Sequence, residues 1–511
     1  MHRMRLTLSL LALAVVCNCT SGPSRPPHGL PNVVVLYADD LGYGDLSCYN
    51  PDSRILTPHI DRLASEGMRF VDAHSSSGIC TPSRYSLLTG RHHWRKFHEI
   101  VESFGPPVIE PERLTVPEMM RMHGYRTACF GKWHLGWDWA AIRREGAVPS
   151  TEPGKPQGYA PDAFDWSLPV PGGPLAHGFD HYFGDDVPNF PPYAWIEDDR
   201  LPVAPTVPYV PSPVPSEGQA EGRPGPMVVG WQQDQVMPTL QERVVAWLAA
   251  QRREQGPFFL YFPFTSPHAP ILPVAEFRGR SGAGSYGDFV MQTDAVVGAV
   301  LRALDEFGFA DDTLVVFASD NGPETYAFER VRSFGHRSMG NLRGLKRDVW
   351  EGGHRTPFVV RWPGRVRPGS VSEALLGQVD LMATLAAVLG HELPPDAAED
   401  SFNQLPVLLG EQAAVRTYLV HNTFKDRYAL RQGDWLYLQG KGGSHSPVPK
   451  WFQQAEGLQP VTEPFSLHDL RRDPGQRTNL AAQHPEVVAQ MKALLQQLRA
   501  QGHSCPRLEG S

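Results

Sequence analysis

Two hydrophobic patterns alternate along residues 32–365 of this chain. Continuous apolar runs are typical of strands buried on both faces, and apolar residues three or four apart are typical of helices packed on a sheet. The runs expected to form strands are Asn32–Ala38, Tyr125–Phe130, Phe258–Pro263, Thr313–Ser319 and Phe358–Arg361. The segments expected to form helices are Thr57–Ala64, Thr115–His123, Thr239–Arg253 and Tyr286–Phe307. This alternation predicts an α/β fold with a mostly parallel central sheet and helices on both faces.

After about residue 400 the pattern changes to short strands of alternating polarity, followed by one amphipathic helix. These elements are expected at Arg416–Val420, Tyr428–Leu430, Trp435–Leu438, Ser466–Leu470 and Pro485–Gln501. Such a series is typical of an antiparallel sheet in an α+β arrangement. We therefore expect a main α/β domain at residues 32–400 and a smaller C-terminal subdomain at 401–511.

Two stretches of the main domain show no clear period. Residues 187–226 are rich in proline and predict a long surface excursion of polyproline II character, which either walls a cleft or is a passive insertion. Residues 324–343 are predicted to form a loop that carries Arg330, His336 and Arg337.

The N-terminus has the pattern of a signal peptide at residues 1–19, with Arg3 and Arg5 before a short apolar run, and then a linker at 20–31. We expect an exported protein, periplasmic or secreted, with a lipoprotein anchor at Cys17 or Cys19 as a weaker alternative. No later segment is apolar and long enough to predict a membrane span. The six cysteines are too few and scattered for a disulfide scaffold. A net charge of -8 over 511 residues argues against a nucleic-acid binder.

Polar side chains follow four of the expected strands, at the point where each strand ends. They are Asp39, Asp40, Lys132, His134, His268, Asp320 and Asn321. Because parallel strands place their carboxyl ends on one edge of a sheet, these groups can meet there. Three carboxylates and an amide oxygen form a hard oxygen site for Ca²⁺ or Mg²⁺. Taken alone, the acidic pairs are equally compatible with ordinary strand-exit turns, and the Lys-x-His pair with a structural role.

Cys80 begins the stretch Cys80–Arg91, in which Pro82 suits the first turn of a helix and Gly90 its end. The cysteine is therefore expected at a helix N-terminus, where negative charge is favoured, with Arg84 one turn further on the same face. Alone, Cys80 is as well explained by a buried structural cysteine. However, the side chains of Arg84, Lys132 and Lys346 together supply the cations that a small oxyanion needs.

Six segments carry a resemblance to a known family. They are N-V-V-V-L-Y-A-D-D-L-G-Y-G-D, C-T-P-S-R-Y-S-L-L-T-G-R, G-Y-R-T-A-C-F-G-K-W-H-L-G, S-P-H-A-P, F-A-S-D-N-G-P and K-R-D-V-W-E-G-G-H-R-T-P. In this order, between residue 32 and about 365, they resemble the successive motifs of the type I sulfatases, in the alkaline-phosphatase-like α/β superfamily. The resemblance implies an alkaline-phosphatase-like fold and a catalytic domain at residues 32–400.

The resemblance also implies a role for each candidate residue. Cys80 is converted to formylglycine before the protein folds, and its hydrate attacks sulfur to form a sulfate ester intermediate. A calcium ion, with Mg²⁺ the less favoured alternative, is held by that hydrate and by Asp39, Asp40, Asp320 and Asn321. Arg84 and the ion favour the deprotonated hydroxyl, and Lys132 and Lys346 balance charge on the sulfuryl oxygens. His268 or Lys346 protonates the leaving alcohol, and His134 then removes the proton that lets sulfate depart.

The implied substrate is a sulfated carbohydrate or an aryl sulfate, from which an exo-acting enzyme removes the sulfate. The implied maturation partner is the formylglycine-generating enzyme. A phosphate or phosphonate ester hydrolase and a silent glycan-binding homologue, with Cys80 unconverted, are the alternatives. One family position is not matched: Asp185-Asp186 follows the Gly178–Gly184 segment, where members often have serine. His92 and His93 are interpreted as surface residues and are left out of the site.

Overall fold

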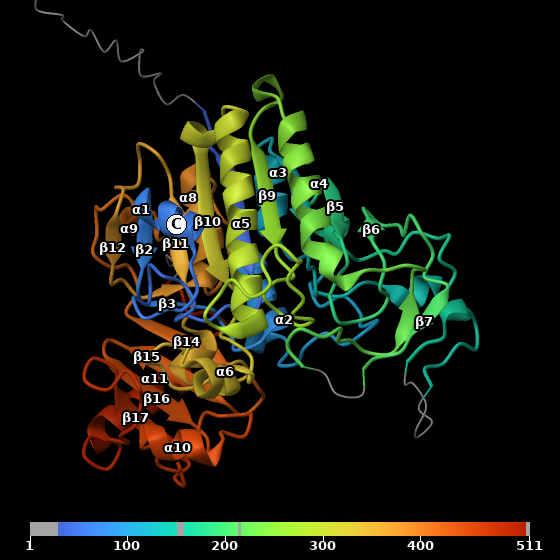
Figure 1. The fold of residues 1–511 in the computed structure, drawn as a ribbon. Helices are drawn as coiled ribbons and strands as arrows, with labels where there is room; N and C mark the ends of the chain where they lie inside the picture. Colours follow the sequence, from blue (N-terminus) through green and yellow to red (C-terminus); the bar gives the residue numbers. More distant parts are fainter. Residues whose placement is uncertain (1–28, 151–157, 213–215, 507–511) are drawn as a thin grey trace, which may run out of the picture. The chain divides into compact units, whose positions relative to one another are not determined.

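The computed structural model describes residues 29–150, 158–212 and 216–506, and within them the main sheet has nine strands (Figure 1). Their order across the sheet is β12-β2-β11-β10-β1-β9-β4-β5-β6. In chain order the strands are β1 (Asn32–Ala38), β2 (Met68–Phe70), β4 (Arg126–Phe130), β5 (His181–Gly184), β6 (Ile196–Glu197), β9 (Phe258–Pro263), β10 (Thr313–Ser319), β11 (Phe358–Arg361) and β12 (Ser370–Ser372). The small strands β3 (Ala73–His74) and β13 (Leu376–Gly377) form a separate pair, as do β7 (Val207–Tyr209) and β8 (Gly225–Met227).

The centre of the sheet is parallel, as the continuous apolar runs predict. β1 pairs in parallel with both β10 and β9, and β9 pairs in parallel with β4. Every residue of β1 is buried. Val33, Val35 and Tyr37 belong to one hydrophobic cluster, whereas Val34 and Leu36 belong to another. The alternating side chains of one strand thus separate two cores, one on each face of the sheet.

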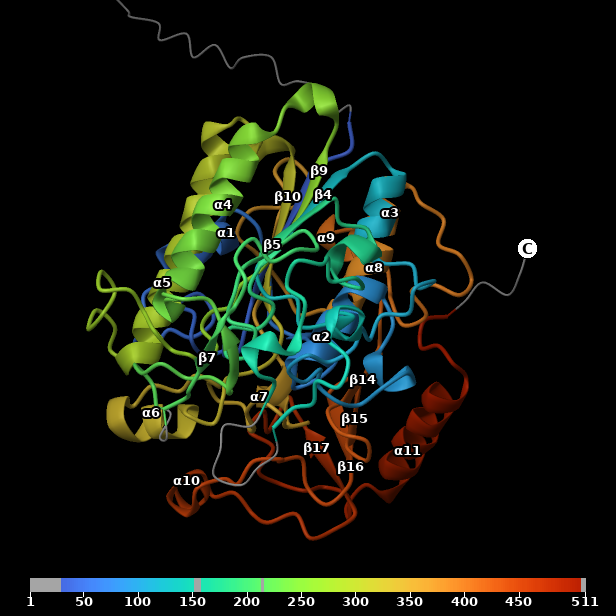
Figure 2. The ribbon, with the colours of Figure 1, turned by 90° about the vertical axis from the view of Figure 1, so that its right-hand side faces the viewer.

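Helices cover both faces, which confirms the predicted α/β class (Figure 2). One core contains side chains of α1 (Pro58–Ser65), α4 (Val236–Ala250) and α5 (Gly284–Glu306). The other contains side chains of α2 (Cys80–Thr89), α3 (Val116–Met122), α8 (Leu381–Leu389) and α9 (Leu405–Leu408). Thr115 and Glu118 form the capping box that begins α3.

The C-terminal subdomain is the expected antiparallel sheet. Its strands are β14 (Tyr418–Asn422), β15 (Tyr428–Gln432), β16 (Trp435–Gln439) and β17 (Phe465–Asp469), in that order. One face packs against α11 (Pro485–Ala500) through Met491, Leu495 and Leu498. The short helix α10 (Lys450–Glu456) lies between β16 and β17 in the chain.

Several local expectations were wrong. The helix expected at 239–253 begins at Val236 and ends at Ala250. The loop expected at 324–343 contains α6 (Ala327–Phe334), whose apolar residues Ala327 and Phe328 pack into a small cluster. The first part of the proline-rich segment is not a surface excursion, because Phe190, Tyr193 and Ile196 are buried.

The signal peptide expected at 1–19, and nearly all of the linker, lie outside the described residues. Within the part of the chain that the structure describes, no helix combines the length and the apolarity that crossing a bilayer requires.

Candidate active site at the carboxyl edge of the sheet

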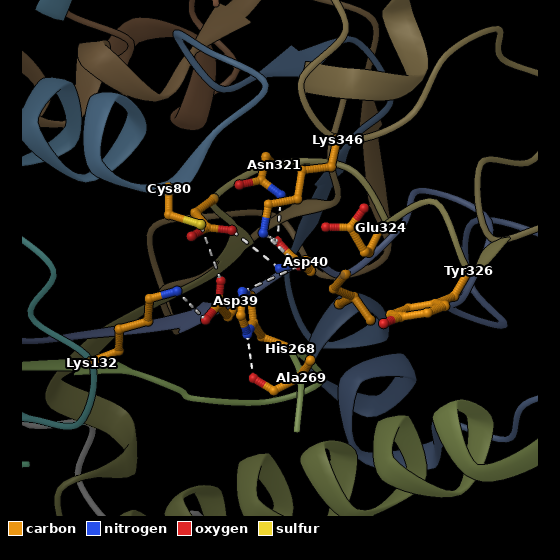
Figure 3. Close-up of polar contacts among 12 residues, drawn as sticks. Asp39, Asp40, Cys80, Lys132, His268, Ala269, Asn321, Glu324, Tyr326 and Lys346 are labelled. Carbon is orange, nitrogen blue, oxygen red and sulfur yellow. Dashed lines mark hydrogen bonds and ion pairs between the residues drawn. The ribbon is translucent and has the colours of Figure 1, made fainter. Parts of the chain in front are cut away.

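Four neighbouring parallel strands end at the same edge of the sheet, and the polar residues after them converge there (Figure 3). Asp39 and Asp40 follow β1, Asp320 and Asn321 follow β10, and Lys132 follows β4. All five side chains are buried. The predicted meeting of the strand ends is therefore what the structure shows.

Each of the paired aspartates faces a lysine. Lys132 Nζ lies 2.6 Å from Asp39 Oδ2, and Lys346 Nζ lies 2.7 Å from Asp40 Oδ2. Burial alone would raise the pKa of Asp40, but the charges of Lys346 and His268 hold that pKa well below its ordinary value. Asp40 is thus ionised, and the two aspartates contact lysines that come from two different segments of the chain.

Cys80 is the first residue of α2, as expected, and its side chain is only 1% exposed. Its Sγ lies 3.6 Å from Asp39 Oδ1. Burial raises the pKa of the thiol to about 12, even though Lys132 and Lys346 act in the opposite direction. The thiol is therefore protonated at neutral pH, which makes unmodified cysteine a poor nucleophile at this position.

Arg84 lies one turn along α2 and is fully buried. Its Nη2 and Nε donate to Asp320 Oδ2 at 2.8 and 3.1 Å, and its Nη1 donates to the Lys132 carbonyl at 3.0 Å. Burial and the nearby Asp39 raise the pKa of Asp320 to about 6, although Arg84 opposes this shift. Arg84 thus connects α2 to the residues that follow β10 and β4.

The oxygen atoms at this edge fit a hard cation. The Asn321 amide donates to Asp40 Oδ1 at 2.7 Å, while its own Oδ1 is buried without a hydrogen-bond partner. One ligand atom from each of Asp39, Asp40, Cys80 and His268 lies within 4.8 Å of the others. Carboxylate and amide oxygens are the ligands that Ca²⁺ prefers, and an unpartnered buried oxygen is a ready position for such an ion.

His268 faces the aspartates from the loop after β9. Its Nδ1 donates to the Ala269 carbonyl at 2.5 Å, which leaves Nε2 facing Asp40 Oδ2 at 3.7 Å. Burial, together with the charges of Lys346 and Lys132, lowers the pKa of His268 to about 3. The ring is therefore neutral in this state, with its free nitrogen directed at the site.

His134 does not continue the extended conformation of β4. Its φ is 54°, and its backbone N–H donates to Asp186 Oδ1 at 3.0 Å. Its Nε2 lies 3.0 Å from the Val101 carbonyl, and its Nδ1 is buried without a partner. The ring packs edge-on against Phe190 of the proline-rich segment.

Three acidic residues at the site were not assigned a role from the sequence. Asp186 holds the His134 backbone, and both oxygens of the buried Asp185 lack a partner. Because Asp185-Asp186 follow β5, the same strand-exit pattern could have identified them. Glu324 accepts from Arg347 Nη1 at 2.7 Å, beside Lys346 (Figure 3), and no sequence signal marks it.

The sequence analysis interpreted His92 and His93, which follow α2, as surface residues, and this interpretation was wrong. His92 and His93 are both fully buried. His92 Nδ1 lies 3.1 Å from Ser76 Oγ, and His93 Nε2 lies 3.2 Å from Asn422 Oδ1 of β14. They connect the region after α2 to β14 and to the segment after β3.

The α/β fold and the site together indicate a hydrolase that acts on esters of a small oxyanion. The sulfatase family model matches residues 31–391 of the chain. The chain is 34% identical over 498 residues to the N-acetylgalactosamine-6-O-sulfatase of Bacteroides thetaiotaomicron, covering 92% of this chain and 93% of that protein. It is also 34% identical over 498 residues to human arylsulfatase A, covering 92% and 88%.

Among solved structures, one from a study of how Bacteroides thetaiotaomicron metabolises multiple glycosaminoglycans superposes with a TM-score of 0.76. It is 31% identical in sequence, and the match covers 92% of this chain and 99% of that one. The chain therefore belongs to the sulfatase family, and it is a sulfuric ester hydrolase.

Proposed function

We propose that this protein hydrolyses sulfate monoesters to an alcohol and inorganic sulfate, using a formylglycine made from Cys80. The observation that carries the proposal is the position of Cys80: first residue of a buried helix, 3.6 Å from Asp39, between Lys132 and Lys346. A protonated thiol is a poor nucleophile, whereas a hydrated aldehyde at the same place supplies a hydroxyl to attack sulfur and a second hydroxyl through which sulfate can be expelled.

The charges of the site suit a sulfate ester. Arg84, Lys132 and Lys346 balance Asp39, Asp40 and Asp320, so the resting site is close to neutral. We propose that Asp39, Asp40, Asp320 and Asn321, with the modified Cys80, hold a calcium ion. That ion would supply positive charge that lowers the pKa of the attacking hydroxyl. Its charge also offsets the negative charge that the ester brings into a buried site.

Lys132 and Lys346 are also proposed to contact the substrate. With an ion held by the aspartate oxygens, the ammonium groups of Lys132 and Lys346 would be free to contact the sulfuryl oxygens. Charge develops on those oxygens in the transition state, so fixed cations there favour it over the ground state. Arg84 stays on Asp320 and holds the helix that carries position 80.

Two histidines are placed for proton transfer. We propose that His268 Nε2, which faces the site, carries the proton to the leaving alcohol, with Lys346 as the alternative donor. The sulfate anion raises the proton affinity of His268 by bringing negative charge beside it. His134, with its unpartnered Nδ1, is the proposed base that removes the proton when sulfate leaves.

The substrate is proposed to be a sulfated sugar, because one relative is an N-acetylgalactosamine-6-O-sulfatase. We further propose that the enzyme is exo-acting and removes sulfate from the sugar at the end of a glycan chain. Arylsulfatase A as a second relative adds aryl sulfates to the list to be tested. We further propose export from the cytoplasm, and maturation by a formylglycine-generating enzyme.

The experiment is expression with a formylglycine-generating enzyme, followed by mass spectrometry of the peptide that carries Cys80 and an activity screen. The screen covers sulfated monosaccharides, sulfated oligosaccharides, aryl sulfates and the corresponding phosphate and phosphonate esters. We expect a peptide lighter than the cysteine form, sulfate release from sulfated sugars, and no release by a Cys80→Ala variant.

Two results would contradict the proposal. Faster cleavage of phosphate or phosphonate esters than of every sulfate ester would identify the alternative hydrolase. A protein that keeps Cys80 unmodified in its native host and binds glycans without cleaving them would be the silent homologue.

A further inference from the structure

Three buried histidines lie together outside the catalytic residues. They come from separate segments: His74 ends β3, His354 ends α7 (Glu351–His354), and His421 lies in β14 of the C-terminal sheet. All three side chains are fully buried. One ring nitrogen of each lies within 4.8 Å of the other two.

The hydrogen bonds of the three rings fix which nitrogen of each carries a proton. His354 Nε2 faces the Val349 carbonyl at 3.2 Å, and His421 Nδ1 faces the Ser75 carbonyl at 3.2 Å. His74 Nε2 faces Asp72 Oδ1 at 2.9 Å. Carbonyl and carboxylate oxygens only accept, so each of these nitrogens must donate.

In a neutral imidazole the second nitrogen then carries a lone pair and can only accept a hydrogen bond or bind a metal. The three lone pairs belong to His74 Nδ1, His354 Nδ1 and His421 Nε2. The two Nδ1 atoms lie only 3.1 Å apart, and His421 Nε2 is buried with no hydrogen-bond partner. A shared proton would satisfy the His74–His354 pair but would leave His421 bare. One metal ion satisfies all three nitrogens.

The outer contacts also follow the pattern of metal-binding histidines. Such residues donate their other N–H to a carboxylate or a backbone carbonyl, which fixes the ring and its tautomer. Here Asp72 is held in turn by Arg431, whose Nη2 lies 2.9 Å from Asp72 Oδ2. Glu351 has a carboxylate oxygen, Oε1, that is buried without a partner, and one oxygen of Glu351 lies within 4.8 Å of ligand atoms of Asp72 and His74.

The spacing of the rings suits a tetrahedral ion for two of the three pairs. With Zn–N bonds of about 2.0–2.1 Å, two imidazoles on one tetrahedral ion have ring centroids about 5 Å apart. The ring centroid of His74 lies 5.3 Å from that of His354 and 5.0 Å from that of His421. His354 and His421 are stacked at 3.7 Å, so one ion held by all three rings would require this pair to separate.

We propose that His74, His354 and His421 form a second metal site, which binds a zinc ion through three imidazole nitrogens. Imidazole nitrogens suit zinc, in contrast to the oxygen ligands at the carboxyl edge of the main sheet. Because the three ligands come from β3, α7 and β14, the ion links the C-terminal sheet to two segments of the main domain. Its binding energy adds to the stability of the folded chain.

The test is the zinc content of the whole purified protein, produced with zinc chloride in the medium and measured by elemental mass spectrometry after gel filtration. We expect about one zinc per chain in the wild type. His421→Phe keeps a ring stacked on His354 but has no lone pair, so its zinc content should fall at least tenfold. His177→Phe, at another buried histidine, and Asp40→Asn, at the catalytic edge, should keep their zinc.

A second measurement does not depend on any variant folding. Wild-type protein produced with cobalt chloride should show the visible absorption of tetrahedral cobalt, and a strong zinc chelator should lower the Tm of the zinc form. Folded wild-type protein with no bound zinc and no cobalt absorption would overturn the proposal, as would unchanged zinc in His421→Phe.

Discussion

At the scale of single residues, the site depends on buried charges that are satisfied by one another. Arg84 makes two hydrogen bonds to one oxygen of Asp320 and a third to the Lys132 carbonyl. A planar guanidinium can make these contacts together, whereas an ammonium group is a single point of charge. Geometry as well as charge is therefore required at position 84.

Arg84→Lys is expected to lower kcat by about 100-fold or more, because Asp320 and α2 lose their fixed relation. Steady-state kinetics on an aryl sulfate would measure the effect. Arg62→Lys is a matched control, since Arg62 pairs with Glu66 on the exposed side of α1. Unchanged kcat in Arg84→Lys would show that charge alone is sufficient.

His268→Gln should affect substrates according to their leaving group. Sugar alcohols are poor leaving groups and need a proton, so kcat/KM on a sulfated sugar should fall by about 10²–10⁴. An activated aryl sulfate, whose phenolate leaves unaided, should lose much less. If Lys346→Gln shows this selective loss and His268→Gln loses both activities equally, Lys346 is the acid.

Much of the site could be predicted from residue types at strand ends. Asp39, Asp40, Lys132, Asp320 and Asn321 were placed correctly because a parallel sheet forces its strand ends together. The orientation of His134 could not be predicted, because a positive φ and the hydrogen bond to Asp186 turn the backbone there. Hydrogen-bond partners distant in sequence leave no local pattern.

At the scale of elements, the helix that carries Cys80 is buried along its whole length. It ends at Gly90, which has a φ of 64° and packs closely against the chain around Ala398. The helix α2 was predictable, since proline marks its first turn and glycine follows its end. The helix α6 was not, because it is short and lies in a stretch dense in arginine.

Two glycines that end helices in the left-handed conformation provide a matched pair. A Cβ at Gly90 would lie 2.9 Å from Ala398 Cα, whereas a Cβ at Gly390, at the end of α8, would have no atom within 4 Å. Gly390→Ala should therefore cost about 1 kcal/mol from backbone strain alone. Gly90→Ala should cost about 1–3 kcal/mol more from crowding. Urea unfolding would compare them, and equal losses would contradict the crowding argument.

At the scale of the whole molecule, stability should depend on buried neutral histidines. Burial lowers the pKa of His177 to about 4, from an ordinary value of 6.5 that the unfolded chain recovers. Between pH 6.5 and 4 the unfolded state thus binds more protons, so stability falls as the pH falls.

His177→Phe keeps a ring against Trp133 but cannot take up a proton. The free energy of unfolding of this variant, measured from pH 7 to 4, should fall less steeply than that of the wild type, by up to about 1.4 kcal/mol per pH unit. Identical slopes would mean that His177 does not contribute.

The overall architecture was accessible from the sequence because continuous apolar runs mark the parallel sheet and short strands of alternating polarity mark the antiparallel one. The strand order was not, since β2 and β12 are short and give no periodic signal. The contact between the region after α2 and the C-terminal sheet, through His92 and His93, also had to be seen in three dimensions.

Because position 80 is buried in the folded protein, the maturation that we propose must take place before α2 packs. Once α2 has packed, a thiol that is 1% exposed is out of reach of any other protein. The fraction of active molecules is then decided by kinetic competition between the modifying enzyme and collapse of the sheet. Conditions that slow folding should yield more active protein per chain, and no later treatment can rescue molecules that folded too soon.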